Sequence, residues 1–322
     1  MLTKYEQIVD VHNIASRGEN TNLSEVEREA RRLPYIIGLA ENESLPPATC
    51  DAKRVLLLNI DMQNDFMEGI GSLAVPGSKG DVERLTRWIY DNMNKITQIM
   101  CSLDTHSEAQ IFHPSWWEDE EGNHPAPFTP IKYDDVAQGK WRPLYPGPVW
   151  SEEKQKLVQS MAYSQEYVKA LGEMRIWPYH CLAGTFGAGL EGEFAKMLYF
   201  HSAARKSRPA LIQKGSNPYS EMYGIIKAEY DPSNFLNTPV LTAVESFDEI
   251  YLAGEAASHC LKISGLQILE YFANRLDVTQ KITILEDCTS PIPGCEKETL
   301  DAFNGFKAQY GIRVAKSTDI QL

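Results

Sequence analysis

The stretch RVLLLNIDMQNDF, residues 54 to 66, passes from a mainly apolar run into a polar loop at Asp61. A short apolar run with no polar alternation is typical of a strand that is covered on both faces, as in a parallel sheet. Other runs of this kind are residues 99 to 103, 209 to 213, 249 to 253 and 281 to 285. The sequence therefore predicts five buried strands.

Helical patterns lie between several of these strands. Residues 81 to 94 repeat apolar side chains at helical spacing, and residues 260 to 274 do the same. Strands that alternate with helices predict an α/β fold in three layers, with a doubly wound, mainly parallel sheet and helices on both faces. We assign this domain to residues 51 to 322.

Two segments lie outside the alternation. Residues 1 to 50 form an N-terminal extension with one short expected helix, which Ser24 and Glu27 open in capping-box spacing. We expect this arm to pack on the core or on a partner subunit. Residues 107 to 171 form an insertion that holds four of the six tryptophans. Long insertions after a strand serve as lids or substrate walls, or in packing and subunit contacts.

Composition narrows the class of protein. The 322 residues are 43% hydrophobic and 23% charged, with a formal net charge of -13, which disfavours nucleic-acid and anionic-membrane partners. No apolar segment is long enough for a signal peptide or a membrane span, so a cytoplasmic protein is expected. The six cysteines show no CxxC spacing, which favours reduced thiols over disulfides or a zinc knuckle.

Reactive side chains follow four of the predicted strands. They are Asp61, Asp104, Lys214 and Cys260. Each has an ordinary explanation alone, as a helix cap, a surface lysine or a small buried hydrophobe. Because ligands collect at the carboxyl edge of a doubly wound sheet, their shared position favours a functional site.

Five motifs in order carry a family resemblance. They are LLLNIDMQNDFMEGIGSLAVPGS (56 to 78), DTH (104 to 106), WPYHCLAGTFGAGL (177 to 190), QKGSNPYSEMY (213 to 223) and GEAASHCLKISGLQILE (254 to 270). Together they resemble the isochorismatase-like cysteine hydrolases, and the nicotinamidase branch in particular. The resemblance covers about residues 52 to 290 and leaves the arm and most of the insertion unmatched.

The resemblance implies a catalytic triad of Asp61, Lys214 and Cys260. Cys260 would form an acyl-enzyme thioester, Asp61 would act as general base and then acid, and Lys214 would balance the charge. A helix N-terminus and an ammonium group would both lower the pKa of the thiol. Backbone N–H groups of Ala256 and Cys260 would hold the oxyanion, with a cis peptide between Glu255 and Ala256.

The same branch implies a divalent metal held by Asp104, His106 and His180. Spacing of two residues at a strand end lets Asp104 and His106 reach one ion. Carboxylate and imidazole ligands suit zinc, which we expect, and also manganese or iron. The alternative is that both histidines are hydrogen-bonded cleft residues.

Nicotinamide is the expected substrate, converted to nicotinate and ammonia. Phe66, Gln63, Trp177 and His259 are the predicted substrate contacts, so His259 is a pocket residue and not the base for Cys260. Gln110 stands where some relatives have another histidine, and Ala257 and Ser258 replace the usual Thr-Asp. These departures keep open a hydrolase for another amide, carbamoyl or ureido group.

Two other readings are disfavoured. Vinyl-ether hydrolysis of isochorismate belongs to a branch that does not use the cysteine. A non-enzymatic nucleotide-binding module would need a G-x-G-x-x-G after the first strand, and this chain has none there. The only partners expected are a small-molecule amide and further copies of this chain in a homo-oligomer.

Overall fold

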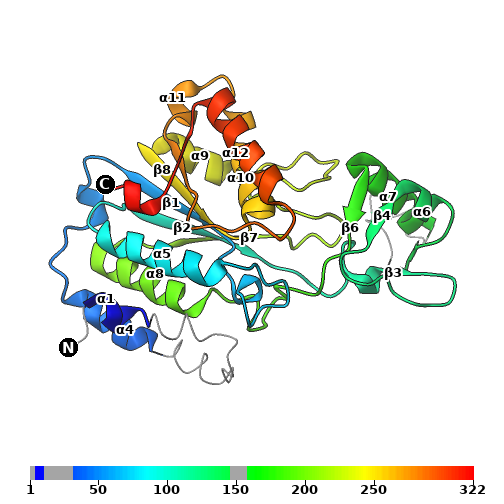
Figure 1. The fold of residues 1–322 in the computed structure, drawn as a ribbon, viewed down its shortest axis with the longest axis horizontal. Coiled ribbons are helices and arrows are strands. Elements are labelled where there is room, and N and C mark those ends of the chain that lie inside the picture. The colour runs from blue at the N-terminus through cyan, green and yellow to red at the C-terminus, as the bar shows by residue number, and fades with distance from the viewer. Residues whose placement is uncertain (1–3, 11–31, 146–157) are drawn as a thin grey trace.

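The central sheet has six strands in the order β10-β9-β8-β1-β2-β7. The computed structural model describes residues 4–10, 32–145 and 158–322. Every neighbouring pair of these strands is parallel, and helices cover both faces of the sheet (Figure 1), so the predicted three-layer α/β fold is confirmed. The strands are β1 (Val55–Ile60), β2 (Gln98–Asp104), β7 (Ala210–Lys214), β8 (Glu249–Gly254), β9 (Ile282–Leu285) and β10 (Arg313–Ala315).

Strand β10 is the one strand of this sheet that the sequence did not predict. It is three residues long and pairs only with β9, at the edge of the sheet. An edge strand has a neighbour on one side only, and none of the β10 side chains is fully buried. A continuous apolar run is therefore missing. The other edge strand, β7, was predicted as a buried strand, but only its last residue, Lys214, is buried, so the predicted burial was wrong there.

The two faces of the sheet have separate hydrophobic cores. Leu57 of β1 belongs to the core under α5 (Ser78–Asp91) and α8 (Gly192–Arg205). Leu56 and Leu58 belong to the core on the other face. That face is covered by α9 (Thr238–Ser246), α10 (Lys262–Tyr271), α11 (Leu276–Thr279) and α12 (Glu296–Tyr310). Burial on both faces explains the unbroken apolar character of the run around β1.

The described part of the N-terminal arm packs on the outer side of α8. It consists of α1 (Lys4–Ile8) and α4 (Leu33–Glu41), and Tyr5 and Ile36 are each 1% exposed. The Tyr5 hydroxyl lies 2.9 Å from Thr86 Oγ1 of α5. The expected helix at Ser24 falls outside the described residues. None of the helices that the structure describes is long and apolar enough to cross a membrane.

The insertion after β2 forms a small module with a core of its own. Trp116 and Trp117 are buried at its centre, together with Tyr167, whereas Trp150 lies outside the described residues. Its elements are η3 (Pro114–Trp116), β3 (Trp117–Glu118), β4 (Pro130–Lys132), α6 (Tyr133–Ala137), β5 (Arg142–Pro143), α7 (Val158–Leu171) and β6 (Glu173–Arg175). Strand β3 pairs with β5 and β4 with β6, both antiparallel.

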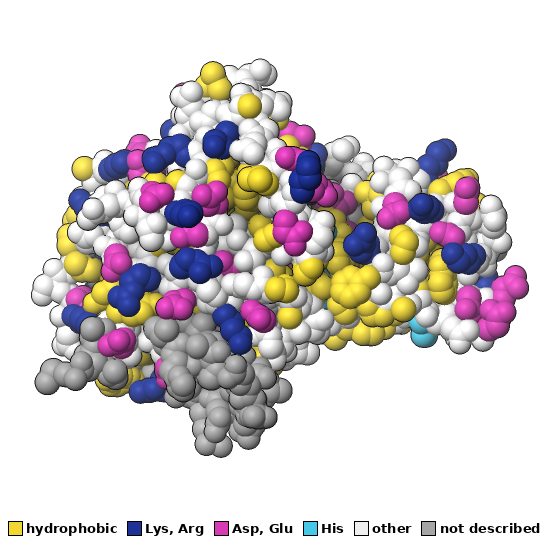
Figure 2. All heavy atoms as spheres, viewed as in Figure 1, with side chains coloured by type: hydrophobic (Ala, Val, Ile, Leu, Met, Phe, Trp, Pro, Cys, Tyr) yellow, Lys and Arg dark blue, Asp and Glu magenta, His cyan; other side chains and the backbone are white. Residues whose placement is uncertain are grey.

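This module projects from the carboxyl edge of the sheet (Figure 1). Figure 2 shows acidic and basic side chains interspersed over the main body, and hydrophobic side chains gathered where the module meets it. Two of the four tryptophans therefore serve first to pack the module. A role as a lid or substrate wall stays a prediction.

Candidate active site

The four reactive residues converge at the carboxyl edge of adjacent strands. Asp61 follows β1, Asp104 ends β2 and Lys214 ends β7, while Cys260 lies in the turn after β8. These strands are neighbours in the order β8-β1-β2-β7. The topology therefore collects residues that are up to 199 positions apart, from Asp61 to Cys260.

Lys214 lies at the centre of this group. Its Nζ is 2.9 Å from Asp61 Oδ2, 3.0 Å from Asp104 Oδ1 and 3.7 Å from Cys260 Sγ. It also donates to the Met222 carbonyl oxygen at 3.1 Å. All four groups are buried, and one ammonium faces two carboxylates. A further cation or a proton is needed to balance the second carboxylate.

Asp61 is held in place by Ser102 of β2. The Ser102 hydroxyl donates to Asp61 Oδ1 at 2.7 Å and accepts from the Asp61 backbone N–H at 3.1 Å. The backbone φ of Asp61 is +44°, in the left-handed region. Such a conformation is uncommon for a residue other than glycine and turns the chain sharply as it leaves β1. The carboxylate then lies within 4.8 Å of Cys260 Sγ.

Burial and the neighbouring charges together set the pKa values of Cys260, Asp61 and Lys214. It raises the pKa of the Cys260 thiol well above its usual range, and the Lys214 ammonium opposes this only in part. Burial also raises the pKa of Asp61, again against Lys214. For Lys214 itself, burial lowers the pKa, but Asp104 and Asp61 raise it well above the usual value. The expectation of a lowered thiol pKa therefore needs correction, since it counted the neighbouring charge and not the desolvation.

Cys260 lies at the N-terminal end of a helix. A π-helical turn (Ala257–Leu261) leads directly into α10. Before it, Gly254 has φ +112°, and a Cβ there would overlap the Ile60 carbonyl oxygen, so glycine is required. The peptide between Glu255 and Ala256 is cis, as the family resemblance implies. The Ala256 N–H has no acceptor within the described parts of the chain.

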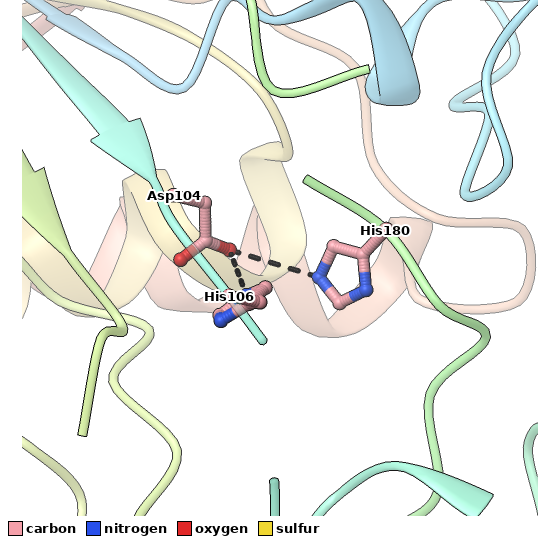
Figure 3. A group of neighbouring side chains, drawn as sticks. All are labelled: Asp104, His106 and His180. Atoms are coloured by element: carbon pink, nitrogen blue, oxygen red, sulfur yellow. Dashed lines mark ion pairs between the residues drawn. The ribbon is translucent and has the colours of Figure 1, made fainter. Parts of the chain in front are cut away.

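Asp104, His106 and His180 form a second group beside Lys214 (Figure 3). Asp104 Oδ2 lies 3.0 Å from His106 Nε2 and 3.7 Å from His180 Nε2. A backbone bridge between His106 and Leu182 brings the segment with His180 alongside the end of β2. The spacing prediction for Asp104 and His106 thus agrees with the geometry.

The ring orientations in this group fit a bound cation. His106 Nδ1 lies 3.0 Å from the Gly215 carbonyl oxygen, and His180 Nδ1 lies 2.8 Å from that of Pro178. A carbonyl only accepts, so each Nδ1 carries a hydrogen, and a neutral ring then turns its Nε2 lone pair toward the Asp104 carboxylate. Burial lowers the pKa of His180, which favours that neutral form, whereas for His106 the Asp104 carboxylate outweighs burial and raises the pKa. Three converging lone-pair donors, with Nδ1–H anchored to carbonyls, are the arrangement of a divalent metal site.

Gln63 is placed differently from the prediction. Its Nε2 donates to the Asp104 carbonyl at 2.8 Å and to the Ala188 carbonyl at 2.9 Å, and its Oε1 accepts from the Asp104 N–H at 2.7 Å. These bonds occupy the amide, and the side chain is fully buried away from the cavity. Gln63 is thus a support for the end of β2 and not a substrate contact.

The other predicted contacts line a cavity above Cys260. Phe66, Trp177 and His259 contribute to its wall, and Asp104, His180 and Ala256 also reach it. Trp177 Nε1 donates to the Tyr223 hydroxyl at 3.0 Å, and the His259 ring packs edge-on against Trp177 at 5.4 Å between centroids. The cavity therefore places aromatic side chains next to the reactive groups.

His259 does not reach toward the thiol as a base would. Its Nδ1 lies 2.8 Å from Ser258 Oγ, and its ring contacts Trp177 and Tyr223. Burial lowers the pKa of His259 to about 4. His259, the residue before Cys260, therefore lines the cavity wall. The candidate base is the Asp61 carboxylate, which follows another strand, β1.

Two residues of the site were not predicted from the sequence. Glu221 is 5% exposed and lines the cavity, and burial raises its pKa to about 7. Its signal was an acidic residue seven positions after Lys214 inside a motif already recognised. His113 lies with its ring 5.8 Å from that of His106 and 5.9 Å from that of His180.

Comparisons with known proteins found a curated relative and solved structures of similar fold. No family model matches the chain. A curated relative, the nicotinamidase of Saccharomyces cerevisiae, is 24% identical over 238 residues, which are 73% of this chain and 88% of the yeast protein. The motif order and this relative agree in pointing to one family.

Solved structures share the fold. The yeast nicotinamidase bound to the inhibitor nicotinaldehyde has a TM-score of 0.56 and 19% identity, over 81% of this chain and 99% of that one. A nicotinamidase and pyrazinamidase of Acinetobacter baumanii has a TM-score of 0.54 and 18% identity, over 83% of this chain and 98% of that one.

Proposed function

We propose that this chain, which belongs to the isochorismatase-like family, hydrolyses a carbon–nitrogen amide bond with Cys260 as nucleophile, and that nicotinamide is the substrate. The observation that carries the proposal is the convergence of Asp61, Lys214 and Cys260 beneath a cavity lined by aromatic side chains, directly beside Asp104, His106 and His180. The nicotinamidase relative supports the substrate.

The first half of the reaction forms a thioester. Asp61 removes the proton of the Cys260 thiol as the sulfur attacks the amide carbon, because burial disfavours a free thiolate before substrate arrives. The carbonyl oxygen becomes an oxyanion, which the N–H groups of Ala256 and Cys260 stabilise. Asp61 then gives its proton to the leaving nitrogen, ammonia departs, and the acyl group remains on sulfur.

The second half releases the acid. Water attacks the thioester carbon and gives a proton to Asp61, and a second oxyanion occupies the same N–H groups. When this intermediate collapses, the carbon–sulfur bond breaks and the proton returns to Cys260. Lys214, 2.9 Å from Asp61 Oδ2 and 3.7 Å from Cys260 Sγ, stays charged throughout and stabilises whichever of the two is anionic.

Asp104, His106 and His180 would hold a divalent metal, with zinc as the expected ion. The buried carboxylate and the two Nε2 atoms that face it support this assignment. A metal there would supply a Lewis-acid site for a ring nitrogen of the substrate. Phe66 and Trp177 would then enclose the ring, and Cys260 would face its carboxamide.

An ammonia-release screen tests the proposal. Purified protein is assayed with nicotinamide, pyrazinamide and a series of aliphatic amides, and its metal content is measured by elemental analysis. We expect ammonia from nicotinamide, about one divalent ion per chain, and no activity in Cys260→Ala. Ammonia from aliphatic, carbamoyl or ureido substrates only, from protein without metal, would overturn the nicotinamide assignment and leave the cysteine hydrolase.

A further inference from the structure

Two buried carboxyl groups meet behind the loop that precedes Cys260. Glu255 is 0% exposed, and Asp81, in the first turn of α5, is 1% exposed. The two side chains are in hydrogen-bonding contact. Yet Asp81 Oδ2 and Glu255 Oε1 have no conventional donor in the described part of the chain. Two carboxyl oxygens form such a contact only when one of them carries a proton.

The charges around the pair balance one carboxylate and not two. From α5, Arg84 Nη2 donates to Asp81 Oδ1 at 2.8 Å, through a side chain that is 44% exposed. From the loop after β9, the Ser290 N–H donates weakly to Glu255 Oε2 at 3.4 Å, and the Ser290 side chain hydrogen-bonds Asp81. Asp287 and Cys288 are the other titratable groups of that loop near the pair, and neither is a cation.

The proton therefore belongs to Glu255. Arg84 already faces Asp81 and favours its ionised form. Burial and the neighbouring Asp81 both raise the pKa of the Glu255 carboxyl well above its usual range. Glu255 then donates to Asp81, in the same way that paired acids in a dry site share one proton.

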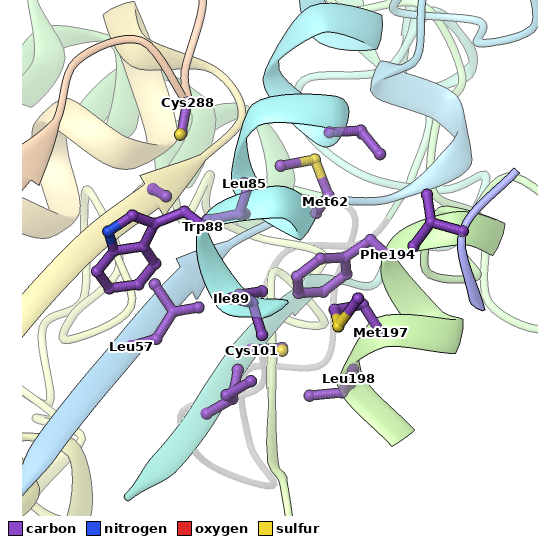
Figure 4. Packing of buried hydrophobic residues seen from close by; sticks show 14 of the residues in the cluster. Leu57, Met62, Leu85, Trp88, Ile89, Cys101, Phe194, Met197, Leu198 and Cys288 are labelled. Atoms are coloured by element: carbon purple, nitrogen blue, oxygen red, sulfur yellow. The ribbon is translucent and has the colours of Figure 1, made fainter. Parts of the chain in front are cut away.

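Asp81 is a rigid partner because α5 is fixed on the sheet. Leu85, one turn after Asp81, is fully buried, and so is Ile89 a further turn along. Trp88 packs on the same side, and Figure 4 shows these side chains directed at the core around Leu57. An anchor on this helix face has little freedom to move.

The loop that carries Glu255 is tied on both sides of one peptide. The Glu255 N–H donates to the Ile60 carbonyl at 2.8 Å, and the Ala257 N–H donates to the Ser290 carbonyl at 2.8 Å. The N–H between them, that of Ala256, has no acceptor among the described residues, and Ala256 lines the cavity above Cys260. The Glu255 side chain belongs to the residue before this peptide. Its contact with Asp81 holds the peptide against α5.

We propose that Glu255 is a positioning residue, whose neutral carboxyl group donates to Asp81 and thereby directs the Ala256 N–H at the oxyanion. The expected effect of Glu255 on kcat rests on the proposed function. The shared proton does not, because it follows from the burial and contact of the two acids alone.

Two substitutions at Glu255 test the positioning. In Glu255→Gln the amide still donates to Asp81, so we expect kcat within about threefold of the wild type. In Glu255→Leu the hydrogen-bond donor to Asp81 is lost. We therefore expect kcat to fall by about 10- to 100-fold, which is somewhat less than the effect of removing an oxyanion donor. KM should stay within about threefold, because the oxyanion exists only along the reaction path.

A matched control separates positioning from stability. Asp51, which is partly buried, forms an ion pair with the buried Arg205 at the amino-terminal edge of the sheet, before β1 begins. Asp51→Asn should lower the thermal midpoint to a similar extent as Glu255→Leu, with kcat unchanged. Wild-type kcat in Glu255→Leu, or an equal loss in Glu255→Gln and Glu255→Leu, would overturn the positioning role.

The shared proton has a readout that needs no activity. An unfolded glutamate ionises near 4.5, whereas folded Glu255 keeps its proton, so above that pH the folded chain binds one more proton than the unfolded chain. Folding stability from this group is thus highest below pH 4.5 and is lost as the pH rises. Glu255→Gln removes the ionisable group, so this loss of stability with rising pH should be absent from the variant.

Urea unfolding between pH 5 and 8 measures this linkage. The ratio of the unfolding constants of the wild type and Glu255→Gln should grow with pH, by up to about tenfold per unit. Parallel stability curves would overturn the shared proton, whatever the substrate. Absence of ammonia release by the wild type, with the pH difference present, would instead count against the proposed function and its positioning step.

Discussion

Two clusters of buried acids lie close to Cys260, and the chain neutralises them in different ways. In the first, Asp61 and Asp104 share the Lys214 ammonium, at 2.9 and 3.0 Å. In the second, Asp81 and Glu255 have one half-exposed guanidinium between them. The first cluster has a buried ammonium between its two carboxylates and needs one further cation or proton. In the second cluster the guanidinium contacts Asp81, and Glu255 has to keep a proton.

This difference corresponds to two tasks. A carboxylate beside a buried ammonium remains available to take up a proton and return it, which a general base must do. A carboxyl group that keeps its proton is a fixed donor and serves to hold backbone in place. The same residue type therefore performs chemistry in one cluster and support in the other, and the neighbouring cation decides which.

The largest expected effect comes from removing the mobile proton site. Asp61→Asn should lower kcat by about 100- to 10,000-fold, because an amide cannot accept the thiol proton. Asp81→Asn should lower it by less than about tenfold, because asparagine can still hydrogen-bond Glu255. Steady-state ammonia release measures both. Equal losses in the two variants would remove the distinction between the clusters.

Metal removal tests the group of Asp104, His106 and His180, which shares Asp104 with the first cluster. Chelation should abolish nicotinamide turnover, and zinc should restore it, because Asp104, His106 and His180 have no other cation among the described residues that they all face. Elemental analysis before and after gives the stoichiometry. Full turnover by metal-free protein would support the alternative amide, carbamoyl or ureido substrates.

Gly215 gives a test of geometry with a control in the same chain. Its φ is +75°, and a Cβ there would lie 2.5 Å from both Asp104 Oδ1 and His106 Cε1. Gly122 has φ +82°, and a Cβ there would have none of the described atoms within 4 Å beyond its chain neighbours. Gly215→Ala and Gly122→Ala share the left-handed backbone cost of roughly 1 to 3 kcal/mol. Only Gly215→Ala should lose bound metal and more than about tenfold in kcat, and equal metal content in the two would contradict the site geometry.

The smallest effect is expected at the wall of the cavity. His259→Ala should raise KM for nicotinamide by a few-fold and alter the preference for pyrazinamide, with kcat within about tenfold. The reason is that His259 packs against Trp177 and does not face the thiol as a base. A loss of kcat comparable to that in Asp61→Asn would restore a Cys/His mechanism.

The fold could be predicted because the signals were local. The run around β1 is apolar at nearly every position because both faces are covered, and residues that end such strands must share an edge. Strand β10 gave no such signal, since its side chains stay partly exposed. The role of the insertion was also hidden, because the burial of Trp116 and Trp117 depends on contacts within the module.

The site could be predicted in its members and less well in its energetics. The family resemblance brought together Asp104, His106 and His180. It did not reveal that the Gln63 amide hydrogen-bonds the Asp104 backbone. The helix N-terminus and the Lys214 ammonium suggested a low pKa for Cys260, whereas burial raises it. The contact between Asp81 and Glu255 joins residues 174 positions apart, for which one sequence offers no signal. The domain boundary at residue 50 and the homo-oligomer remain predictions.

The most direct test of the central claim is the mass of the protein during turnover. Protein mixed with excess nicotinamide is quenched in acid within one turnover time, and Cys260 is examined by peptide mass spectrometry. We predict a nicotinoyl group in thioester linkage on Cys260 in the wild type, and none in Cys260→Ala. Steady ammonia release with no acyl group on Cys260, or with the group on another residue, would contradict the mechanism.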